Sequence, residues 1–480
     1  MSDLLKAAYD PSAFRKAGHA LIDLLADHLS ALQEGTIPTN PWQHPAEQLA
    51  YWQDYQLGDQ STDQLFKDIL DRSIRVHHPR FMGHQIAPAV PIAALANLVS
   101  GLLANGMAIY EMGPASTAIE RIVCQQMAQK FGLGPDADGL LTSGGTLANL
   151  TALLTARAAK APSNVWNNGH QERLAVMVCE EAHYCIDRAA RIMGLGEEGI
   201  IKIPATPEYR MDTELLEHHL AEAKEQQLTV IAVIGSAPST STGTYDNLKA
   251  IGQFCQENNL WFHVDGAHGG AAIYSDKYRH LLDGVELADS IAIDGHKMMM
   301  TPSIMTYLLF KDKRSGYQTF SQKAQYLWAD AEEAEWHNLA KRTFECTKEM
   351  MSIKLFAIQQ VYGDQLFADF VTHQYDLGQE FGRQVQAHPK LELAHQPDCN
   401  IVCFRMIDPD LEEEELDQLN AQIRAAILSD GQFYIVQTTL RGRTWLRVSL
   451  MNPLTDAGLI QELLEQVVHL SQKFLASSDK

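Results

Sequence analysis

Between about residue 140 and residue 310 the sequence alternates short runs of β-forming residues with stretches of helical spacing, and this alternation limits the fold more than any other feature. Strands and helices that alternate over such a length form a mostly parallel sheet covered by helices on both faces, an α/β fold. Residues 213–227 and 247–259 are two of the helical stretches. The runs predicted as strands are Gly139–Thr142, Leu174–Cys179, Ile200–Ile203, Leu228–Ile234, Trp261–Val264, Ser290–Ile293 and Met305–Phe310.

The sequence has a different texture on either side of this region. Residues 12–33 show apolar spacing of helical type, and Ser12 is the expected N-cap. Beyond about residue 360, two helical stretches flank three short strands, over 365–388, 411–428, 391–393, 400–405 and 444–449. We therefore predict an N-terminal helical segment over 1–85 that contributes to a dimer contact, a large α/β domain over 86–360, and a small α+β domain over 361–480.

Charge and cysteine content exclude some partners. The formal net charge of −22 argues against nucleic acid or an anionic membrane surface, because phosphate binding requires clustered Lys and Arg. The seven cysteines are scattered without a C-x-x-C pair, and Cys399 and Cys403 lack the companion ligands of a zinc site. The first residues show no apolar stretch of signal-peptide type. We expect a reduced, cytoplasmic protein without a bound metal.

One apolar stretch, Ala89–Tyr110, is long enough to span a bilayer. Pro91, Asn97 and Gly101 are among the residues that interrupt it, and no basic residues flank it. We predict a helix buried in the core or in a subunit interface rather than a transmembrane helix.

The turn Ser143–Thr146 follows a predicted strand and opens a helix. The small residues Ser143, Gly144 and Gly145 allow backbone N–H groups to approach an anion, and the helix N-terminus adds partial positive charge. The hydroxyls of Ser143 and Thr146 can donate as well. A phosphate site fits this pattern, as does an ordinary strand–helix turn with Ser as N-cap.

Asp265 ends another strand, within His263-Val264-Asp265-Gly266-Ala267-His268. Ligands of open α/β sheets bind at the carboxyl ends of strands. A carboxylate there can pair with a cationic ring nitrogen, bind metal or act as a base. It can also simply cap the following turn.

Lys297 follows a further strand, within Asp294-Gly295-His296-Lys297. Partial desolvation at this position would lower the pKa of the lysine and favour amine chemistry. His296 could donate to a phosphate. A solvated lysine near a sheet edge is the alternative interpretation.

His183 ends the strand Leu174–Cys179, in Glu180-Glu181-Ala182-His183. Its ring could stack on an aromatic cofactor, or it could be a capping or core histidine. Pyridoxal 5′-phosphate (PLP) requires all four features in one sheet: a phosphate turn, a stacking ring, an acidic partner for its ring nitrogen and a lysine for its aldehyde. Their combination therefore predicts a PLP enzyme.

The same residues resemble the group II PLP-dependent amino acid decarboxylases. The resemblance rests on the order Ser-Gly-Gly-Thr, Ala-His, Asp-Gly-Ala-His-Gly-Gly and Asp-Gly-His-Lys. It extends over about residues 70–455, through His78-Pro79-Arg80-Phe81, Tyr110-Glu111-Met112-Gly113-Pro114, Leu446-Arg447-Val448-Ser449 and Asn452-Pro453. It implies a PLP-dependent transferase type I fold, with a seven-stranded, mostly parallel sheet, and a homodimer with the active site at the subunit interface.

The resemblance also implies a role for each matching position. Lys297 would form the Schiff base with PLP, Asp265 would pair with the pyridine nitrogen, His183 would stack on the ring and Ala267 would pack on its other face. Arg447 would meet a substrate carboxylate, and Arg80, His84 and Gln85 could favour an acidic side chain. The remaining contacts to the cofactor, chiefly to its phosphate, would come from Ser143, Gly144, Gly145, Thr146, Ser239, Thr240, Asp294 and His296. The implied reaction is decarboxylation of an L-amino acid to the amine and CO2, a lyase activity of amino acid metabolism.

The sequence departs from the family pattern at three places. The family's protonating tyrosine comes from a loop that falls near residues 313–345, where Tyr317 and Tyr326 lie early and Trp336 and His337 lie late. The proton donor is therefore not assigned. The usual Gly-Thr-Thr segment is replaced by Pro238-Ser239-Thr240, and the usual aromatic residue after His-Lys by Met298.

Other functions use overlapping residues. Aminotransfer, carbon–carbon lysis or decarboxylation coupled to oxidative deamination would use the same PLP site. A catalytically silent scaffold would need neither Lys297 nor Asp265. A metal hydrolase could use His263, Asp265 and His268, but strand alternation points His263 and Asp265 to one face without an established third ligand. The sequence does not identify the amino acid substrate.

Overall fold

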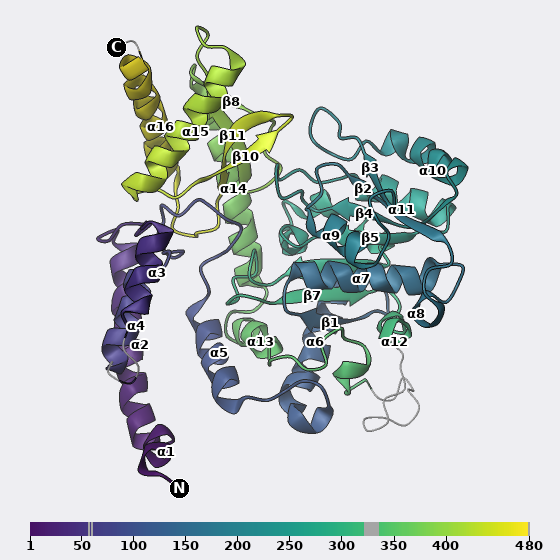
Figure 1. The fold of residues 1–480 in the computed structure, drawn as a ribbon, viewed down its shortest axis with the longest axis horizontal. Helices are drawn as coiled ribbons and strands as arrows, with labels where there is room; N and C mark the ends of the chain where they lie inside the picture. The colour runs from purple at the N-terminus through teal and green to yellow at the C-terminus, as the bar shows by residue number, and fades with distance from the viewer. Residues whose placement is uncertain (56–57, 59–60, 321–335, 479–480) are drawn as a thin grey trace. The chain divides into compact units, whose positions relative to one another are not determined.

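The computed structural model describes residues 1–55, 58, 61–320 and 336–478 (Figure 1). These residues divide into two compact units. The larger comprises Gln85–Arg383 and Leu393–Cys403, and the smaller comprises Met1–His84, Gln384–Glu392 and Phe404–Lys480.

The larger unit is built on a seven-stranded sheet in the order β1-β7-β6-β5-β4-β2-β3. The pairs β2–β3, β2–β4, β4–β5 and β5–β6 are parallel, whereas β7 is antiparallel to both neighbours, β6 and β1. β1 through β6 therefore all point the same way and end at one edge. The strands are β1 (Asp138–Thr142), β2 (Arg173–Cys179), β3 (Ile200–Ile203), β4 (Leu228–Ser236), β5 (Trp261–Asp265), β6 (Ser290–Asp294) and β7 (Thr306–Phe310). All seven predicted strands are confirmed.

Helices bury this sheet on both faces, since every residue of β1, β5, β6 and β7 is buried. α7 packs across β1, β7, β6, β5 and β4, and Figure 1 shows it crossing the sheet; α6, α10 and α11 also pack against strands. The helices are α5 (Pro91–Leu103), α6 (Pro114–Lys130), α7 (Gly145–Lys160), α8 (Val165–Asn168), α9 (Cys185–Ile192), α10 (Leu216–Glu225), α11 (Leu248–Glu257), α12 (Ser315–Phe320), α13 (Ser352–Tyr362) and α14 (Gln365–Ala387). Short 3-10 turns lie at Tyr110–Met112, Thr213–Leu215, Gly270–Tyr274, Arg279–Leu282, Val285–Leu287 and Leu339–Lys341.

The C-terminal part of the chain forms a second, four-stranded sheet in the order β10-β11-β9-β8, with α15 packed against β10, β11 and α16. Its elements are β8 (Leu391–Leu393), β9 (Ile401–Met406), α15 (Glu413–Asp430), β10 (Val436–Leu440), β11 (Arg443–Ser449) and α16 (Ala457–Ser478). The predicted α+β character is confirmed. β10 was missed, because Val-Gln-Thr-Thr-Leu has apolar residues only at its ends and is recognisable as a strand only through its pairing with β11.

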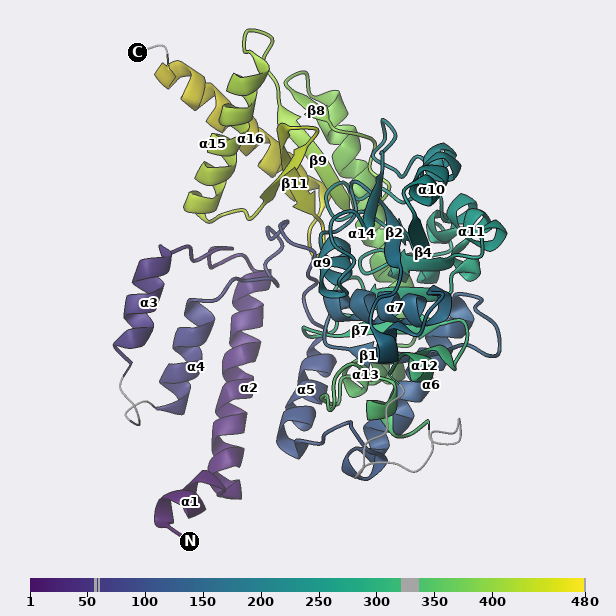
Figure 2. The same cartoon turned by 45° about the vertical axis from the view of Figure 1, so that its right-hand side comes forward.

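The N-terminal residues form α1 (Asp3–Ala8), α2 (Pro11–Gln33), α3 (Pro45–Gln53) and α4 (Thr62–Asp71). α2 and α4 pack together, and Figure 2 shows them side by side. The helix predicted over 12–33 is confirmed, but Ser12 as its cap is wrong. Asp10 is the N-cap, and its carboxylate accepts from the backbone N–H groups of Ser12 and Ala13. Pro11 at the first helical position moves the start one residue earlier.

The apolar stretch Ala89–Tyr110 forms α5 only over 13 residues, and the chain turns at Ala104, which adopts a left-handed conformation. Within the described ranges, no helix is long and apolar enough to cross a membrane.

Candidate active site

A cavity of about 310 Å³ opens at the edge where the parallel strands end, within the size range of small-ligand sites. Residues at or just after the ends of β1, β4, β5 and β6 form much of its lining. All the residues predicted to contact the cofactor line it: Ser143, Gly144, Gly145, Thr146, His183, Ser239, Thr240, Asp265, Ala267, Asp294, His296 and Lys297.

The turn after β1 has the geometry of an anion site. Gly144 has φ of +109°, a conformation that favours glycine, and α7 begins at Gly145. A Cβ added at Gly145 would lie 3.1 Å from a carboxylate oxygen of Asp294, so only glycine fits without displacement. The turn therefore exposes the first N–H groups of a 16-residue helix toward the cavity.

Asp265 is held in place from two sides. Its Oδ1 accepts from the backbone N–H of Ala267 at 3.2 Å, so the turn-capping interpretation is also correct. Its Oδ2 accepts from the side-chain amide of Asn149 at 3.0 Å. The Oδ1 atom of Asn149 in turn lies 2.7 Å from Nε2 of His263. Sequence reasoning assigned no role to Asn149, although its place one helical turn after Gly145 puts it on the same side of α7.

Lys297 is partly buried, with 17% of its side chain exposed, and its Nζ lies 3.0 Å from Oδ2 of Asp294. Burial acts to lower the pKa of Lys297, but the negative charges of Asp294 and Asp265 outweigh burial and raise it above its usual value. The expected lowering was therefore wrong for this structure. Burial in the same way acts to raise the pKa of Asp294, and Lys297 and His296 outweigh it and lower that pKa.

His296 and His183 are positioned by backbone atoms. Nδ1 of His296 lies 3.1 Å from the carbonyl oxygen of Met305, and its Nε2 lies 3.7 Å from Asp294. Nδ1 of His183 accepts from the backbone N–H of Cys185 at 3.3 Å, so we assign the proton to Nε2. Burial and the charge of Lys297 lower the pKa of His183 despite the opposing charge of Asp265. His183 is therefore a neutral ring at neutral pH.

Ser239 and Thr240 follow β4, where the usual family segment is replaced. The hydroxyl of Ser239 lies 2.9 Å from the carbonyl oxygen of Glu181 and 3.0 Å from the hydroxyl of Ser241. The wall of the cavity on this side is therefore tied by hydrogen bonds to the segment that precedes His183.

The predicted substrate residues are not all in the same unit. Gln85 belongs to the larger unit and is not among the residues that line the cavity. His84 and Arg447 belong to the smaller unit, where the ring of His84 lies 5.8 Å from that of Tyr434. Burial is the main cause that lowers the pKa of His84. The positive charges of Arg447 and Arg424 lower it further.

The structure does not identify the proton donor. No tyrosine among the described residues lines the cavity. Tyr317 lies on α12, with its ring 5.6 Å from the guanidinium carbon of Arg342. Arg342 pairs with Asp138 at the first residue of β1, at the end away from the cavity. Tyr326 lies outside the described residues. Trp336 contacts Arg121, and the ring of His337 lies 5.5 Å from that of Tyr110.

The metal alternative finds no geometric support. Within the part of the chain that the structure describes, no group of three or more His, Cys, Asp or Glu residues could hold a metal ion. His263 instead bonds to Asn149 and to Ser290 at 2.9 Å, and His268 bonds to Asn400 at 2.8 Å.

The fold and this cavity define a PLP-dependent enzyme, and comparison with known proteins identifies the family. The profile described as "Pyridoxal-dependent decarboxylase conserved domain" matches residues 50–407, so the chain belongs to this family. An L-aspartate decarboxylase of Metarhizium robertsii is 32% identical over 343 residues, 71% of this chain and 68% of that protein. An L-2,4-diaminobutyrate decarboxylase of Acinetobacter baumannii is 28% identical over 425 residues, 85% of this chain and 83% of that protein. The crystal structure of mouse CSAD superimposes with a TM-score of 0.90 at 24% identity, covering 96% of this chain and 99% of that one.

The chain is accordingly a PLP-dependent carboxy-lyase that converts an L-amino acid to an amine and CO2. Family membership favours decarboxylation over the aminotransfer and carbon–carbon lyase alternatives. The glycine turn, Lys297 beside Asp294 and the doubly hydrogen-bonded Asp265 fit the phosphate, aldehyde and ring nitrogen of PLP.

Proposed function

We propose that the cavity holds PLP with Lys297 as its covalent anchor and its phosphate on the turn Ser143–Thr146. The observation that carries the assignment is that Lys297 lines one cavity together with Asp265 and the glycine turn. His296, Asp294, Ser239 and Thr240 complete the contacts to the cofactor. Their positions around the same cavity support these roles.

We assign to Asp265 the pairing with the pyridine nitrogen. Its two hydrogen bonds, from Asn149 and from the backbone of Ala267, hold the carboxylate in one orientation, and Asp265 lines the cavity. When bound, protonated PLP supplies an electron sink for the electron pair left by the departing CO2. A carboxylate of fixed orientation would favour the protonated ring nitrogen when PLP is bound.

His183 and Ala267 enclose the ring in this proposal. A neutral imidazole stacks on a cationic ring without charge repulsion, and the lowered pKa of His183 supports that state. Ala267 packs on the opposite face, where its small methyl group leaves room for the ring. With PLP bound, the two residues would hold the ring in one position in front of the substrate.

We propose a short acidic L-amino acid as substrate, with aspartate as the first candidate. The aspartate decarboxylase relative, 32% identical to this chain, supports it. The diaminobutyrate decarboxylase relative supports another substrate with a four-carbon skeleton, and its lower identity of 28% makes diaminobutyrate the second candidate. Arg447 meets a carboxylate of the substrate. Nε2 of Gln85 is buried and has no hydrogen-bond partner among the described residues, which supports a contact with substrate.

The test is CO2 release from a panel of aspartate, cysteine sulfinate, glutamate, 2,4-diaminobutyrate, tyrosine and tryptophan, with the amine product measured in parallel. We expect the highest kcat/KM for aspartate or cysteine sulfinate. A preference for diaminobutyrate or an aromatic substrate would overturn the proposed substrate class. Equal yields of aldehyde and CO2 would instead indicate oxidative deamination.

We further propose that the protein is a cytoplasmic homodimer. Exposed apolar side chains on α5, including Leu98, Val99 and Leu102, support a second copy as their cover. The seven cysteines, all free and six of them buried, support a reducing compartment. Sedimentation of the purified protein tests the dimer, and a fully active monomer would contradict it.

A further inference from the structure

The hydroxyl of Ser143, in the turn assigned to the phosphate, donates to a carboxylate that sequence reasoning did not single out. Its Oγ lies 2.5 Å from Oε1 of Glu345. The other oxygen, Oε2, is buried and accepts no hydrogen bond from any residue the structure describes. Glu345 is therefore a half-satisfied carboxylate in direct contact with the phosphate turn.

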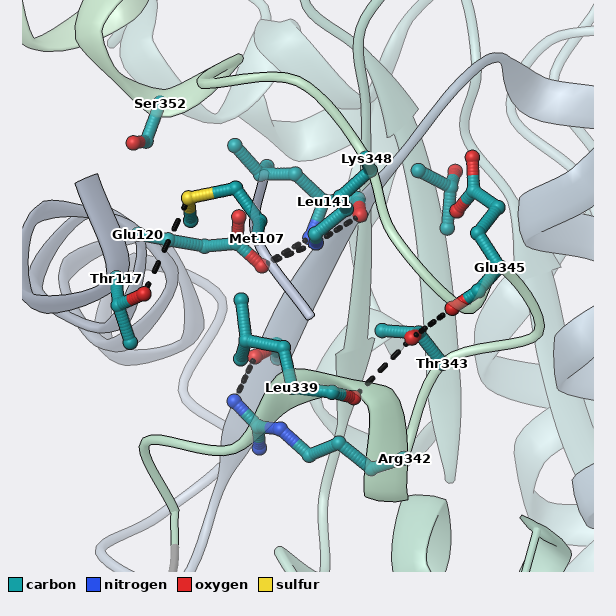
Figure 3. A network of polar contacts seen from close by, with 12 residues as sticks. Met107, Thr117, Glu120, Leu141, Leu339, Arg342, Thr343, Glu345, Lys348 and Ser352 are labelled. Carbon is teal, nitrogen blue, oxygen red and sulfur yellow. Dashed lines mark hydrogen bonds and ion pairs between the residues drawn. The ribbon is translucent and has the colours of Figure 1, made fainter. Parts of the chain in front are cut away.

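The backbone around Glu345 is anchored on both sides, as Figure 3 shows. The hydroxyl of Thr343 lies 3.1 Å from the carbonyl oxygen of Leu339 and 2.7 Å from that of Glu345. Nζ of Lys348 lies 2.5 Å from both Glu120 and the carbonyl oxygen of Leu141 in β1. The segment is thus attached by hydrogen bonds to the strand that carries the turn.

Arg342 and Lys348, the cationic residues nearest to Glu345 in sequence, form ion pairs with other carboxylates. Lys348 and Glu120 form a fully buried ion pair. Arg342 pairs with Asp138 at 2.6 Å and also donates to the carbonyl oxygen of Gly139. Glu345 forms no ion pair within the described ranges, so its charge acts on the turn without compensation from a neighbouring cation.

A phosphate ester and Glu345 make conflicting demands on Ser143. A serine hydroxyl has one proton to donate, so it can donate to Glu345 or to a phosphate oxygen, but not to both. A phosphate monoester also carries nearly two negative charges at neutral pH, because its second pKa is about 6. A carboxylate one hydrogen bond from the turn repels that charge.

We propose that Glu345 competes with the cofactor phosphate for Ser143 and thereby sets the affinity and exchange rate of the cofactor. The inference rests on the proposed placement of the phosphate at the turn Ser143–Thr146. The competing ligand is a phosphate monoester dianion, and loading requires the Glu345 side chain to release the Ser143 hydroxyl. The anchored backbone returns the carboxylate to the same place when the phosphate leaves.

The experiment compares cofactor release from full-length holoprotein and PLP rebinding by the same apoprotein, followed by visible absorbance. Glu345→Gln keeps the shape of the side chain and removes its charge. We expect a Kd for PLP lower by about 5-fold and slower release, since like-charge repulsion is removed. Glu345→Ala, as a second variant, should shift the Kd in the same direction. Inorganic phosphate should raise the Tm of the Glu345→Gln apoprotein more than that of the parent.

Glu198→Gln is the matched control, because Glu198 is exposed and pairs with Arg173 at the amino end of β2, away from the cavity. It should leave the Kd unchanged. An unchanged or weakened PLP affinity in both Glu345 variants would overturn the inference.

Ser143→Ala separates this inference from the site assignment on which it depends. It should weaken PLP binding and reduce the gain produced by Glu345→Gln. A normal Kd in Ser143→Ala would withdraw the assignment of Ser143 to the phosphate, and this inference with it. A weakened Kd in Ser143→Ala without any gain from Glu345→Gln would overturn the inference alone.

Discussion

The carboxylate of Asp294 is buried and lies 3.0 Å from the amine of Lys297, whose side chain is 17% exposed. Because this carboxylate outweighs desolvation, the lysine keeps a proton that it must lose before it can attack an aldehyde. The same residue that positions the lysine therefore also slows its first reaction.

Asp294→Asn should shift the pH dependence of cofactor attachment to lower pH. Only the neutral amine reacts, so the attachment rate rises as pH increases through the pKa of Lys297. Removing the negative charge lowers that pKa, and the variant should load PLP faster near pH 7. Stopped-flow absorbance of apoprotein mixed with PLP across pH 6–10 measures this shift, and an unshifted profile would show that Asp294 does not control the amine.

Lys297→Ala should abolish covalent attachment of PLP and turnover. Residual decarboxylation should fall by at least about 1000-fold, as expected for loss of a nucleophile. Mass spectrometry after borohydride reduction measures attachment. Lys277→Ala is the control, because Lys277 is 59% exposed and pairs with Asp376 at the surface; attachment that survives in Lys297→Ala would disprove the anchor.

Asn149→Ala should weaken PLP binding, because Asp265 then loses the donor to its Oδ2 and His263 loses the acceptor of its Nε2. Leaving such buried groups unpaired costs about 1–3 kcal/mol each. We expect about a 10-fold higher Kd for PLP and a lower Tm. Titration and calorimetry measure the two effects. Thr155→Ala, a buried change on the same helix, is the control that should lower the Tm alone.

The unfolding free energy should decrease as pH falls from about 6.5 to about 4. Burial is the main cause that lowers the pKa of both His78 and His263 to about 4. A histidine with a lower pKa in the folded state takes up its proton more readily in the unfolded state. The free energy of unfolding is therefore highest above the unfolded pKa and decreases as pH falls toward the folded pKa. Each shift corresponds to roughly 3 kcal/mol at most. Urea unfolding at pH 7 and pH 5 tests this, and His263→Gln should show a weaker dependence on pH.

Arg447→Lys should raise KM for the substrate more than it lowers kcat, if the guanidinium meets a substrate carboxylate. A lysine keeps the charge but cannot form the paired hydrogen bonds of arginine. We expect a KM at least about 10-fold higher. Arg383→Lys, at a 72% exposed position paired with Glu380, is the control; an unchanged KM in Arg447→Lys would remove Arg447 from the substrate site.

The seven strands of the main sheet were predictable because each is a short apolar run bounded by turn residues, and a fully buried parallel strand has no polar face to obscure the pattern. The residues after β1, β2, β5 and β6 were predictable for the same reason, since the fold brings those strand ends to one edge. The division into three parts remains a prediction.

Other features depend on contacts between distant residues. Asn149 reaches Asp265 across 116 positions, and Glu345 reaches Ser143 across 202. Neither residue stands in a pattern that distinguishes it from an ordinary helical or loop residue. The pKa of Lys297 was misjudged because burial was considered without the distance to Asp294, which only the folded structure provides.

Helix α7 carries Gly145, in the turn proposed to hold the phosphate, and Asn149, whose side-chain amide donates to Asp265. Four residues of α-helix rise about 6 Å, and each residue turns the chain by about 100°. A single inserted residue between them would leave the helix intact but rotate the amide of Asn149 away from both Asp265 and His263. The number of residues between Gly145 and Asn149 therefore sets the spacing between the two ends of the cofactor site. Substitutions in this helical turn should be tolerated better than insertions or deletions.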